Sequence, residues 1–168
     1  MQLFARCLEN ISDAVLVCDT QFNIIEVNPA FNEITGKSRS EVINSRFELT
    51  LYPSRFMQDI QLQLAKHSRW SGEIREQKDN GDIYQAELTF DVIEDEEGNP
   101  QQYVGVLSDI TDRKQREAEL SRLANNDTLT GLPNRAVFMA KLASLVTHDA
   151  VHALLVFDLD NFKKINDS

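Results

Sequence analysis

The chain has 168 residues, of which 42% are hydrophobic and 26% charged, and its formal net charge is −10. This composition predicts a globular fold with one full hydrophobic core and a smaller appendage, and it excludes collagen-like and disordered classes. The acidic balance opposes nonspecific binding to nucleic acids or anionic lipids, so we expect neither a nucleic-acid partner nor a membrane partner.

The first predicted elements are a β-hairpin and a short helix. Two apolar runs, 14–18 and 24–27, flank a polar turn, which indicates two antiparallel strands. Asn28 can cap a helix that begins at Pro29, and Gly36 suits its left-handed end.

Two further helices are expected before the remaining strands. The segment 38–41 has the spacing of a capping box. Behind Pro53, apolar residues recur every four positions at Phe56, Ile60 and Leu64, as in an amphipathic helix. The segment from Ser54 to Leu64 is therefore predicted to be helical.

The period then changes to two, which predicts three more strands at 69–75, 84–92 and 103–107. Polar turns at 78–82 and 95–100 separate them. The predicted fold class is therefore α+β, with a five-stranded antiparallel sheet and short helices on one face.

A charged helix is expected beyond Ile110, and its only strong apolar residues are Leu120 and Leu123. It either pairs with its copy in a homodimer or is a plain solvated linker. A helix through Phe138 and a buried strand at 153–157 follow.

The compartment can be inferred from absences in the sequence. No apolar run approaches the roughly 20 residues of a membrane span, and the N-terminus lacks the order of a secretory signal. The two cysteines, Cys7 and Cys18, show no spacing typical of a metal site or disulfide framework. We expect a cytoplasmic protein in a reducing compartment.

The part from about residue 11 to residue 113 resembles the PAS family. The resemblance is carried by Asn28-Pro29-Ala30-Phe31, by Trp70-Ser71-Gly72-Glu73 and by Asp109-Ile110-Thr111-Asp112-Arg113. It implies a sensory module with an unknown small molecule between the sheet and the helices, and dimerisation through this domain and the exit helix.

The resemblance also bears on the PAS cofactor. A haem-binding PAS domain has a histidine inside the long helix, whereas His67 is expected just beyond it, so haem is not favoured. A light-sensing flavin PAS domain has a reactive cysteine where Ser45 stands before Arg46-Phe47, which excludes the thiol adduct but not flavin binding. Trp70 and Tyr84 are either cofactor-stacking or core residues.

Residues 158–167 contain a pattern that suits metal and phosphate. Asp158 closes a predicted buried strand, where its carboxylate can bind a hard cation, and Lys163 lies in the first turn of a new helix. A simpler interpretation is that Asp160 or Asn161 caps that helix. Phe162 and Lys163 replace residues that an EF-hand loop needs.

The segment 127–168 resembles the start of a GGDEF domain, the fold of diguanylate cyclases, through Asp127-Thr128-Leu129-Thr130-Gly131-Leu132-Pro133-Asn134-Arg135 and the pattern just described. The resemblance implies Mg²⁺ at Asp158 and the Leu159 carbonyl. It also implies phosphate contacts from Phe162 and Lys163, a transition-state contact from Lys163 in a complete domain, and GTP guanine recognition by Asn166.

Three domains are thus predicted: 1–111 a PAS sensor, 112–126 a linker helix, and 127–168 an incomplete GGDEF segment. Adjacent glycines of the GGDEF hairpin are absent, so we expect this chain alone to be inactive and its parent to join two GTP into cyclic di-GMP. The alternatives are a degenerate GGDEF receptor, a GGDEF-EAL phosphodiesterase, or a stand-alone PAS protein for ligand binding or dimerisation.

Overall fold

The computed structural model describes residues 11–146, 151, 153–157 and 160. The chain divides into two compact units between Glu117 and Ala118. The first unit contains a β-sheet with its helices, and the second contains helices alone among its described elements. The described part of the chain has no helix long and apolar enough to cross a membrane.

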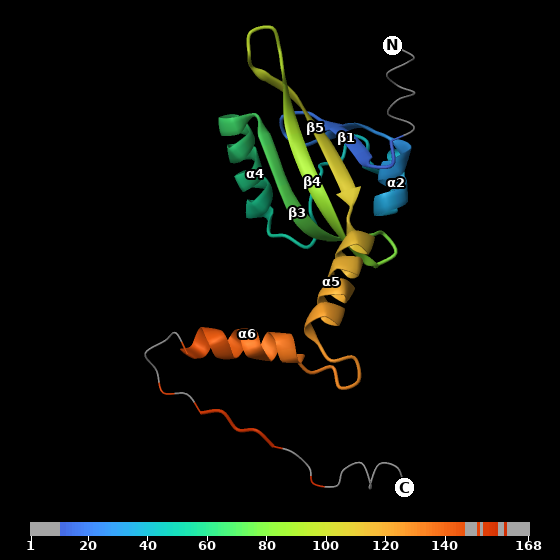
Figure 1. Ribbon diagram of the computed structural model, residues 1–168. Coiled ribbons are helices and arrows are strands. Elements are labelled where there is room, and N and C mark those ends of the chain that lie inside the picture. Colours follow the sequence, from blue (N-terminus) through green and yellow to red (C-terminus); the bar gives the residue numbers. More distant parts are fainter. Residues whose placement is uncertain (1–10, 147–150, 152, 158–159, 161–168) are drawn as a thin grey trace. The chain divides into compact units, whose positions relative to one another are not determined.

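The first unit is built on a five-stranded antiparallel sheet with strand order β2-β1-β5-β4-β3 (Figure 1). Its strands are β1 (Ala14–Cys18), β2 (Ile24–Val27), β3 (Arg69–Gln77), β4 (Ile83–Glu94) and β5 (Pro100–Asp109). The helices are α2 (Pro29–Thr35), α3 (Arg39–Val42) and α4 (Ser54–His67). This architecture confirms the predicted fold class.

Local capping signals set the ends of the first two helices. The Asn28 side chain accepts a hydrogen bond from the Phe31 backbone N–H at 3.1 Å, and Gly36 ends α2 with φ of 78°. At α3 the Glu41 carboxylate accepts from the Ser38 backbone N–H at 2.8 Å. Both caps were predicted from the sequence, because each depends on residues close together in the chain.

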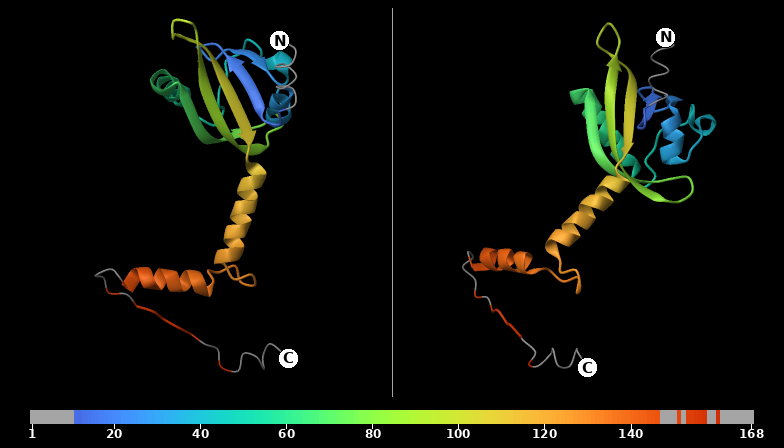
Figure 2. Two further views of the ribbon diagram at one scale, coloured as in Figure 1. Left: turned by 45° about the horizontal axis from the view of Figure 1, so that its top comes forward. Right: turned by 45° about the vertical axis from the view of Figure 1, so that its right-hand side comes forward.

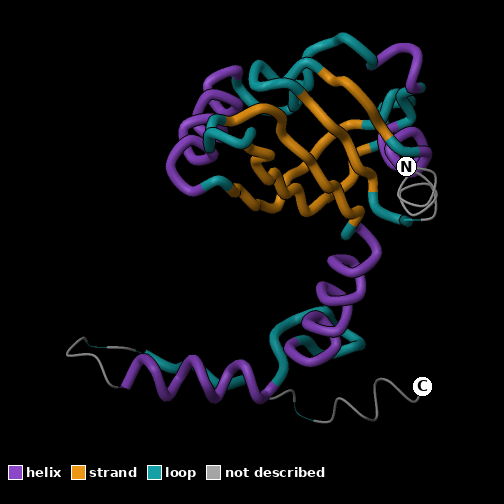
Figure 3. The backbone as a smooth tube through the Cα atoms, turned by 90° about the horizontal axis from the view of Figure 1, so that it is seen from above, coloured by secondary structure: helices purple, strands orange, loops and turns teal. Residues whose placement is uncertain are grey.

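One sheet face carries the core. Strand residues of one parity, including Leu16, Leu88, Phe90 and Leu107, are fully buried and pack against α2 and α4. Figures 1 and 3 show α2 beside β1 and α4 beside β3. The close fit requires Gly105, because a Cβ there would lie 2.6 Å from Leu16 Cδ2.

The helix α4 corrects one sequence prediction. It was expected to end near Leu64, before His67, but it continues for a further turn and ends at His67, with Ser68 as its left-handed cap. The Ser68 backbone N–H donates to the Leu64 carbonyl at 2.9 Å, which closes the last turn. His67 therefore lies within the helix, but its side chain is exposed.

The second unit contains the later part of α5 (Thr111–Asn125) and α6 (Arg135–Val146). The helix expected after Ile110 and the one through Phe138 both form. No side chain of α5 or α6 is buried. Residues 153–157 do not form the predicted buried strand: they are exposed and unpaired in the described residues, because no other strand of this unit is present there to complete their hydrogen bonds.

Candidate functional site

A cavity of about 380 Å³ lies against the sheet and is lined by residues from several elements. This volume is at the lower end of the roughly 300–1,000 Å³ typical of small-molecule sites. Its apolar wall includes Phe31, Val42, Phe47, Tyr84 and Leu107. A compact organic molecule is the class of ligand that such a cavity suits.

Glu76 is the buried charged residue of the cavity wall, with 6% of its surface exposed. Its Oε1 accepts hydrogen bonds from the Thr50 hydroxyl and, at 2.8 Å, from the Gln77 backbone N–H. Its Oε2 has no partner among the described residues. Glu76 was not predicted from the sequence as a site residue, although it has the same strand parity as Trp70 and the buried Ile74.

Tyr84 lies opposite Glu76 in the register of β3 and β4. Burial, then the nearby carboxylates of Glu76 and Asp109, raise the pKa of the Tyr84 phenol well above its usual value. The ring is therefore uncharged at neutral pH. The Lys78 ammonium lies 5.8 Å from its centroid, within range of a cation–π interaction.

Trp70 and Tyr84 were each predicted either to stack on a cofactor or to pack in the core, and the structure places them differently. Tyr84 lines the cavity, whereas Trp70 is not one of its lining residues. Trp70 meets Phe56 of α4 edge to face at 6.0 Å between centroids, and Phe56 stacks on Tyr52 at 4.5 Å. Trp70 thus belongs to the packing of α4 on β3.

The cavity strands connect directly to the exit helix α5. The Gln85 backbone N–H donates to the Thr111 hydroxyl at 3.0 Å, and the Ile110 backbone N–H donates to the Gln85 carbonyl at 2.8 Å. The Lys114 ammonium pairs with Glu73 of β3 at 2.7 Å. The turn between β3 and β4 lies at the end of the sheet from which α5 leaves (Figure 2).

A compact loop joins α5 to α6 in the second unit. The Asp127 carboxylate accepts from the Thr130 hydroxyl at 2.8 Å and from its backbone N–H at 2.9 Å, and these bonds hold the Asp127 pKa below its usual range. Asn134 donates to the Ala124 carbonyl at 2.7 Å and accepts from the Val137 N–H at 3.1 Å. The loop residues thus fix the connection between the two helices.

The residues predicted to bind metal and nucleotide lie outside the described part of the chain. These are Asp158, Leu159, Phe162, Lys163 and Asn166, and their roles remain predictions. Asp160, which is described, is exposed in a turn. Among the described residues, no group of three or more His, Cys, Asp or Glu side chains could hold a metal ion.

A family model of the PAS domain matches residues 12–112, more than half of the chain. The chain belongs to the PAS family. A model described as diguanylate cyclase, GGDEF domain, matches residues 124–168. The PAS domain is therefore followed by a GGDEF segment, as the sequence motifs predicted.

Two curated relatives resemble nearly the whole chain. "Probable diguanylate cyclase DgcE" of Escherichia coli K12 is 28% identical over 171 residues, which is 96% of this chain and 15% of that protein. "Cyclic di-GMP phosphodiesterase PdeB" of Shewanella oneidensis is 26% identical, over 96% of this chain and 19% of that protein. The chain thus spans less than a fifth of either relative.

The PAS fold is also seen in solved structures. A PAS domain from Colwellia psychrerythraea matches with a TM-score of 0.62 and 23% identity, over 67% of this chain and 98% of that domain. At this identity the likeness concerns the fold alone.

Proposed function

We propose that this chain is the sensory part of a cytoplasmic cyclic di-GMP signalling protein, in which the PAS domain controls a diguanylate cyclase through α5. The observation that carries the proposal is one continuous path. Strands β3 and β4, which supply Glu76 and Tyr84 to the cavity wall, bond to the start of α5 through other residues, Glu73 and Gln85. The helix α5 leads into the segment that matches the GGDEF domain. Both relatives described above bear names from cyclic di-GMP metabolism.

The proposed domain order is 1–111 for the sensor, 112–126 for the linker helix and 127–168 for the start of the cyclase. We propose a homodimer in which each subunit presents one GTP. Each 3'-hydroxyl attacks the α-phosphate of the other GTP, so one phosphodiester bond forms and one pyrophosphate leaves per GTP. Dimer alignment through the PAS domains and α5 then sets the rate.

The proposed cyclase site would use Asp158 and the Leu159 carbonyl to hold Mg²⁺. A carboxylate and a carbonyl supply the oxygen ligands that this ion prefers. When bound, Mg²⁺ neutralises developing phosphate charge. Phe162 and Lys163 would contact the phosphates, Lys163 in the transition state, and Asn166 would select guanine. Flavin remains open as the PAS ligand, and haem is disfavoured because His67 is exposed.

A second candidate function is a phosphodiesterase or nucleotide receptor with a degenerate GGDEF domain. The name of the Shewanella relative favours it, since PdeB is called a cyclic di-GMP phosphodiesterase. Reading the coding DNA beyond the codon for Ser168 separates the candidates. An intact Gly-Gly-Asp/Glu-Glu-Phe signature supports the cyclase, an altered signature supports the second candidate, and a stop codon supports a stand-alone PAS protein.

The direct test is product formation by the gene product that contains this sequence, supplied with GTP and Mg²⁺. We expect cyclic di-GMP to form, and the Thr111→Ala and Lys114→Ala variants to change its rate because they loosen the start of α5. Lys141→Ala, an exposed change in α6, is the matched control. Hydrolysis of cyclic di-GMP without synthesis would overturn the cyclase proposal. Equal rates in all variants would overturn control through α5.

A further inference from the structure

The unpaired carboxylate oxygen of Glu76 indicates what the cavity binds. Buried polar atoms are nearly always hydrogen-bonded, and a buried atom without a partner is destabilising, more so when its group is charged. Only 6% of the Glu76 surface is exposed, and its Oε2 has no donor among the described residues. A group from outside the chain can supply that donor.

Among the described residues, no cation pairs with Glu76. None of their five ion pairs includes it. Besides Glu76, the cavity is lined by more acidic than basic side chains. The acidic ones are Glu41, Glu48 and Asp79, and the basic ones are Lys37 and Arg46. The site therefore favours a positive ligand over an anion.

The hydrogen bonds that Glu76 does make hold its carboxylate at the cavity wall. Thr50 and the Gln77 N–H both bond to Oε1, which anchors the group on one side. Oε2 makes no such bond among the described residues, so it is the oxygen left for a ligand. Apolar neighbours, among them Phe31, Phe47 and Tyr84, surround the same space.

We propose that the PAS cavity binds a compact organic cation whose ammonium or amidinium N–H groups donate to the Glu76 carboxylate, while its apolar body contacts the aromatic wall. The inference rests on the sensory role proposed above and adds the chemical class of the signal. A metal ion does not fit, because in the described residues Glu76 belongs to no cluster of three ligating side chains.

The test uses the full chain and three probes that share one ring: benzylamine, benzyl alcohol and benzoate, which are a cation, a neutral donor and an anion. Calorimetric titration should show benzylamine binding at least tenfold more tightly than benzyl alcohol, with benzoate weakest. A tenfold difference in affinity corresponds to about 1.4 kcal/mol, and it is expected because only the amine brings a positive charge to the carboxylate. Equal affinity for the amine and the alcohol, or no binding of the amine, would overturn the proposal.

Glu76→Gln should weaken benzylamine binding at least tenfold while leaving benzyl alcohol nearly unchanged. Glu48→Gln removes an exposed charge from the same wall and should weaken the amine much less. Unchanged amine affinity in the folded Glu76→Gln protein would contradict the assignment. Binding is measured without cyclase output, so a protein that binds the amine but shows no catalytic response refutes only the proposed control of the cyclase.

Discussion

The two units of the chain differ in what covers their apolar side chains. In the sheet unit Phe90 is fully buried and meets Phe22 and Phe47 edge to face at 5.3 and 5.6 Å. In the second unit Phe157 is 84% exposed, and none of the side chains of α5 or α6 is buried. A phenylalanine therefore adds buried apolar surface in the sheet unit, whereas Phe157 in the second unit leaves most of its surface exposed.

The difference shows that apolar pattern and packing are separate requirements. A strand must pair with a neighbour and a helix must cover a face before burial stabilises either of them. Every strand of the sheet unit has a partner, whereas the described residues after Ala118 include no strand. We therefore expect the stability of the described structure to reside in the PAS domain.

The largest expected effect comes from truncating the core. Phe90→Ala should lower the free energy of unfolding by about 3–5 kcal/mol, because it removes buried surface and leaves a cavity. Phe138→Ala, in α6, should cost less than about 1 kcal/mol. Urea unfolding followed by the fluorescence of Trp70, the single tryptophan, measures the effect of each variant on the sheet unit. Equal losses in the two variants would contradict the comparison.

A smaller loss is expected at Asn28, which joins three backbone segments. Its side chain accepts from the Val15 and Phe31 N–H groups at 2.8 and 3.1 Å and donates to the Asp13 carbonyl at 2.9 Å. Asn28→Ala should cost about 2–3 kcal/mol, since it removes a helix cap and leaves buried donors unpaired. The same urea titration measures the loss.

Asn28→Asp is the matched control for that prediction, because it keeps the acceptor oxygen of the cap while it replaces the amide donor with a second, negatively charged oxygen. It should retain most of the stability that Asn28→Ala loses. If the two variants were equally destabilised, the side-chain oxygen that caps α2 would not be the main contribution of Asn28.

Elements fixed by neighbouring residues were predictable from the sequence. The cap at Asn28 and the alternation of β4 needed only local spacing. The end of α4 was predicted too early. Its cap, Ser68, adopts a left-handed conformation, which is typical of glycine and is not predicted from a serine. The prediction of a buried strand at 153–157 was wrong, because a buried strand depends on partner strands that are distant in the sequence.

The candidate site was predicted less well. The resemblance to PAS domains implied a ligand between sheet and helices. Glu76 was identified only from the structure, in which Thr50, far away in the chain, donates a hydrogen bond to it. Its strand parity was the available signal. The cyclase residues from Asp158 to Asn166 lie outside the described residues, so their predicted roles are unchanged by the structure.

The buried thiol of Cys18 makes the stability of the sheet unit depend on pH in the alkaline range. Burial, and secondarily Asp19, raises the pKa of Cys18 from 9.0 to about 12. A raised folded-state value means that the unfolded chain loses its proton first, so stability is full below pH 9 and falls between pH 9 and 12. The expected slope is roughly 1 kcal/mol per pH unit.

Cys18→Ala removes this titration, although it also lowers stability at every pH by leaving a small cavity. The decisive measurement is therefore the slope of unfolding free energy against pH across the alkaline range, not its absolute value. The variant should show a flatter slope than the unaltered protein. Parallel slopes would mean that other groups, such as the Tyr84 phenol, account for the whole alkaline loss.

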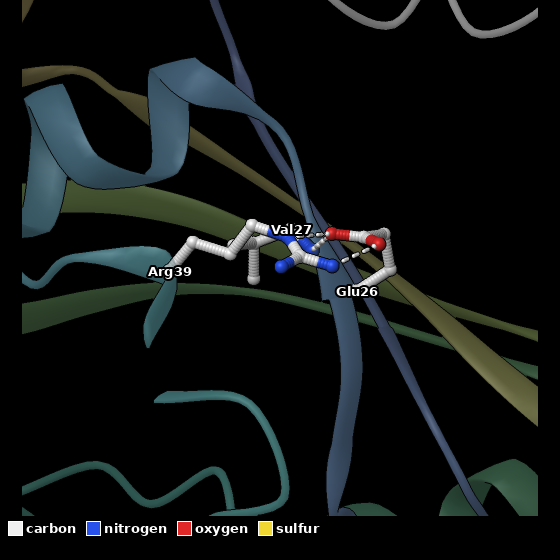
Figure 4. Close-up of polar contacts among 3 residues, drawn as sticks. All are labelled: Glu26, Val27 and Arg39. Carbon is white, nitrogen blue, oxygen red and sulfur yellow. Dashed lines mark hydrogen bonds and ion pairs between the residues drawn. The ribbon is translucent and has the colours of Figure 1, made fainter. Parts of the chain in front are cut away.

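The smallest effect is expected from the surface pair between Glu26 and Arg39. The Arg39 guanidinium donates to both carboxylate oxygens at 2.6 and 2.7 Å (Figure 4). This bonding holds the Glu26 pKa below its usual value of 4.5. Its small contribution is therefore present above that pH and is lost as the pH falls through the folded-state value.

Arg39→Ala should lower the urea midpoint slightly at low ionic strength, and high salt should remove the difference because both side chains are exposed. Arg122→Ala breaks a similar pair with Glu119 inside α5 and should leave Trp70 unfolding unchanged. The Arg39 pair joins α3 to β2, whereas the Arg122 pair joins only one turn of a helix to the next. If Arg122→Ala shifted the midpoint as much as Arg39→Ala, the second unit would contribute to the stability of the sheet, and the contrast between the two units would fail.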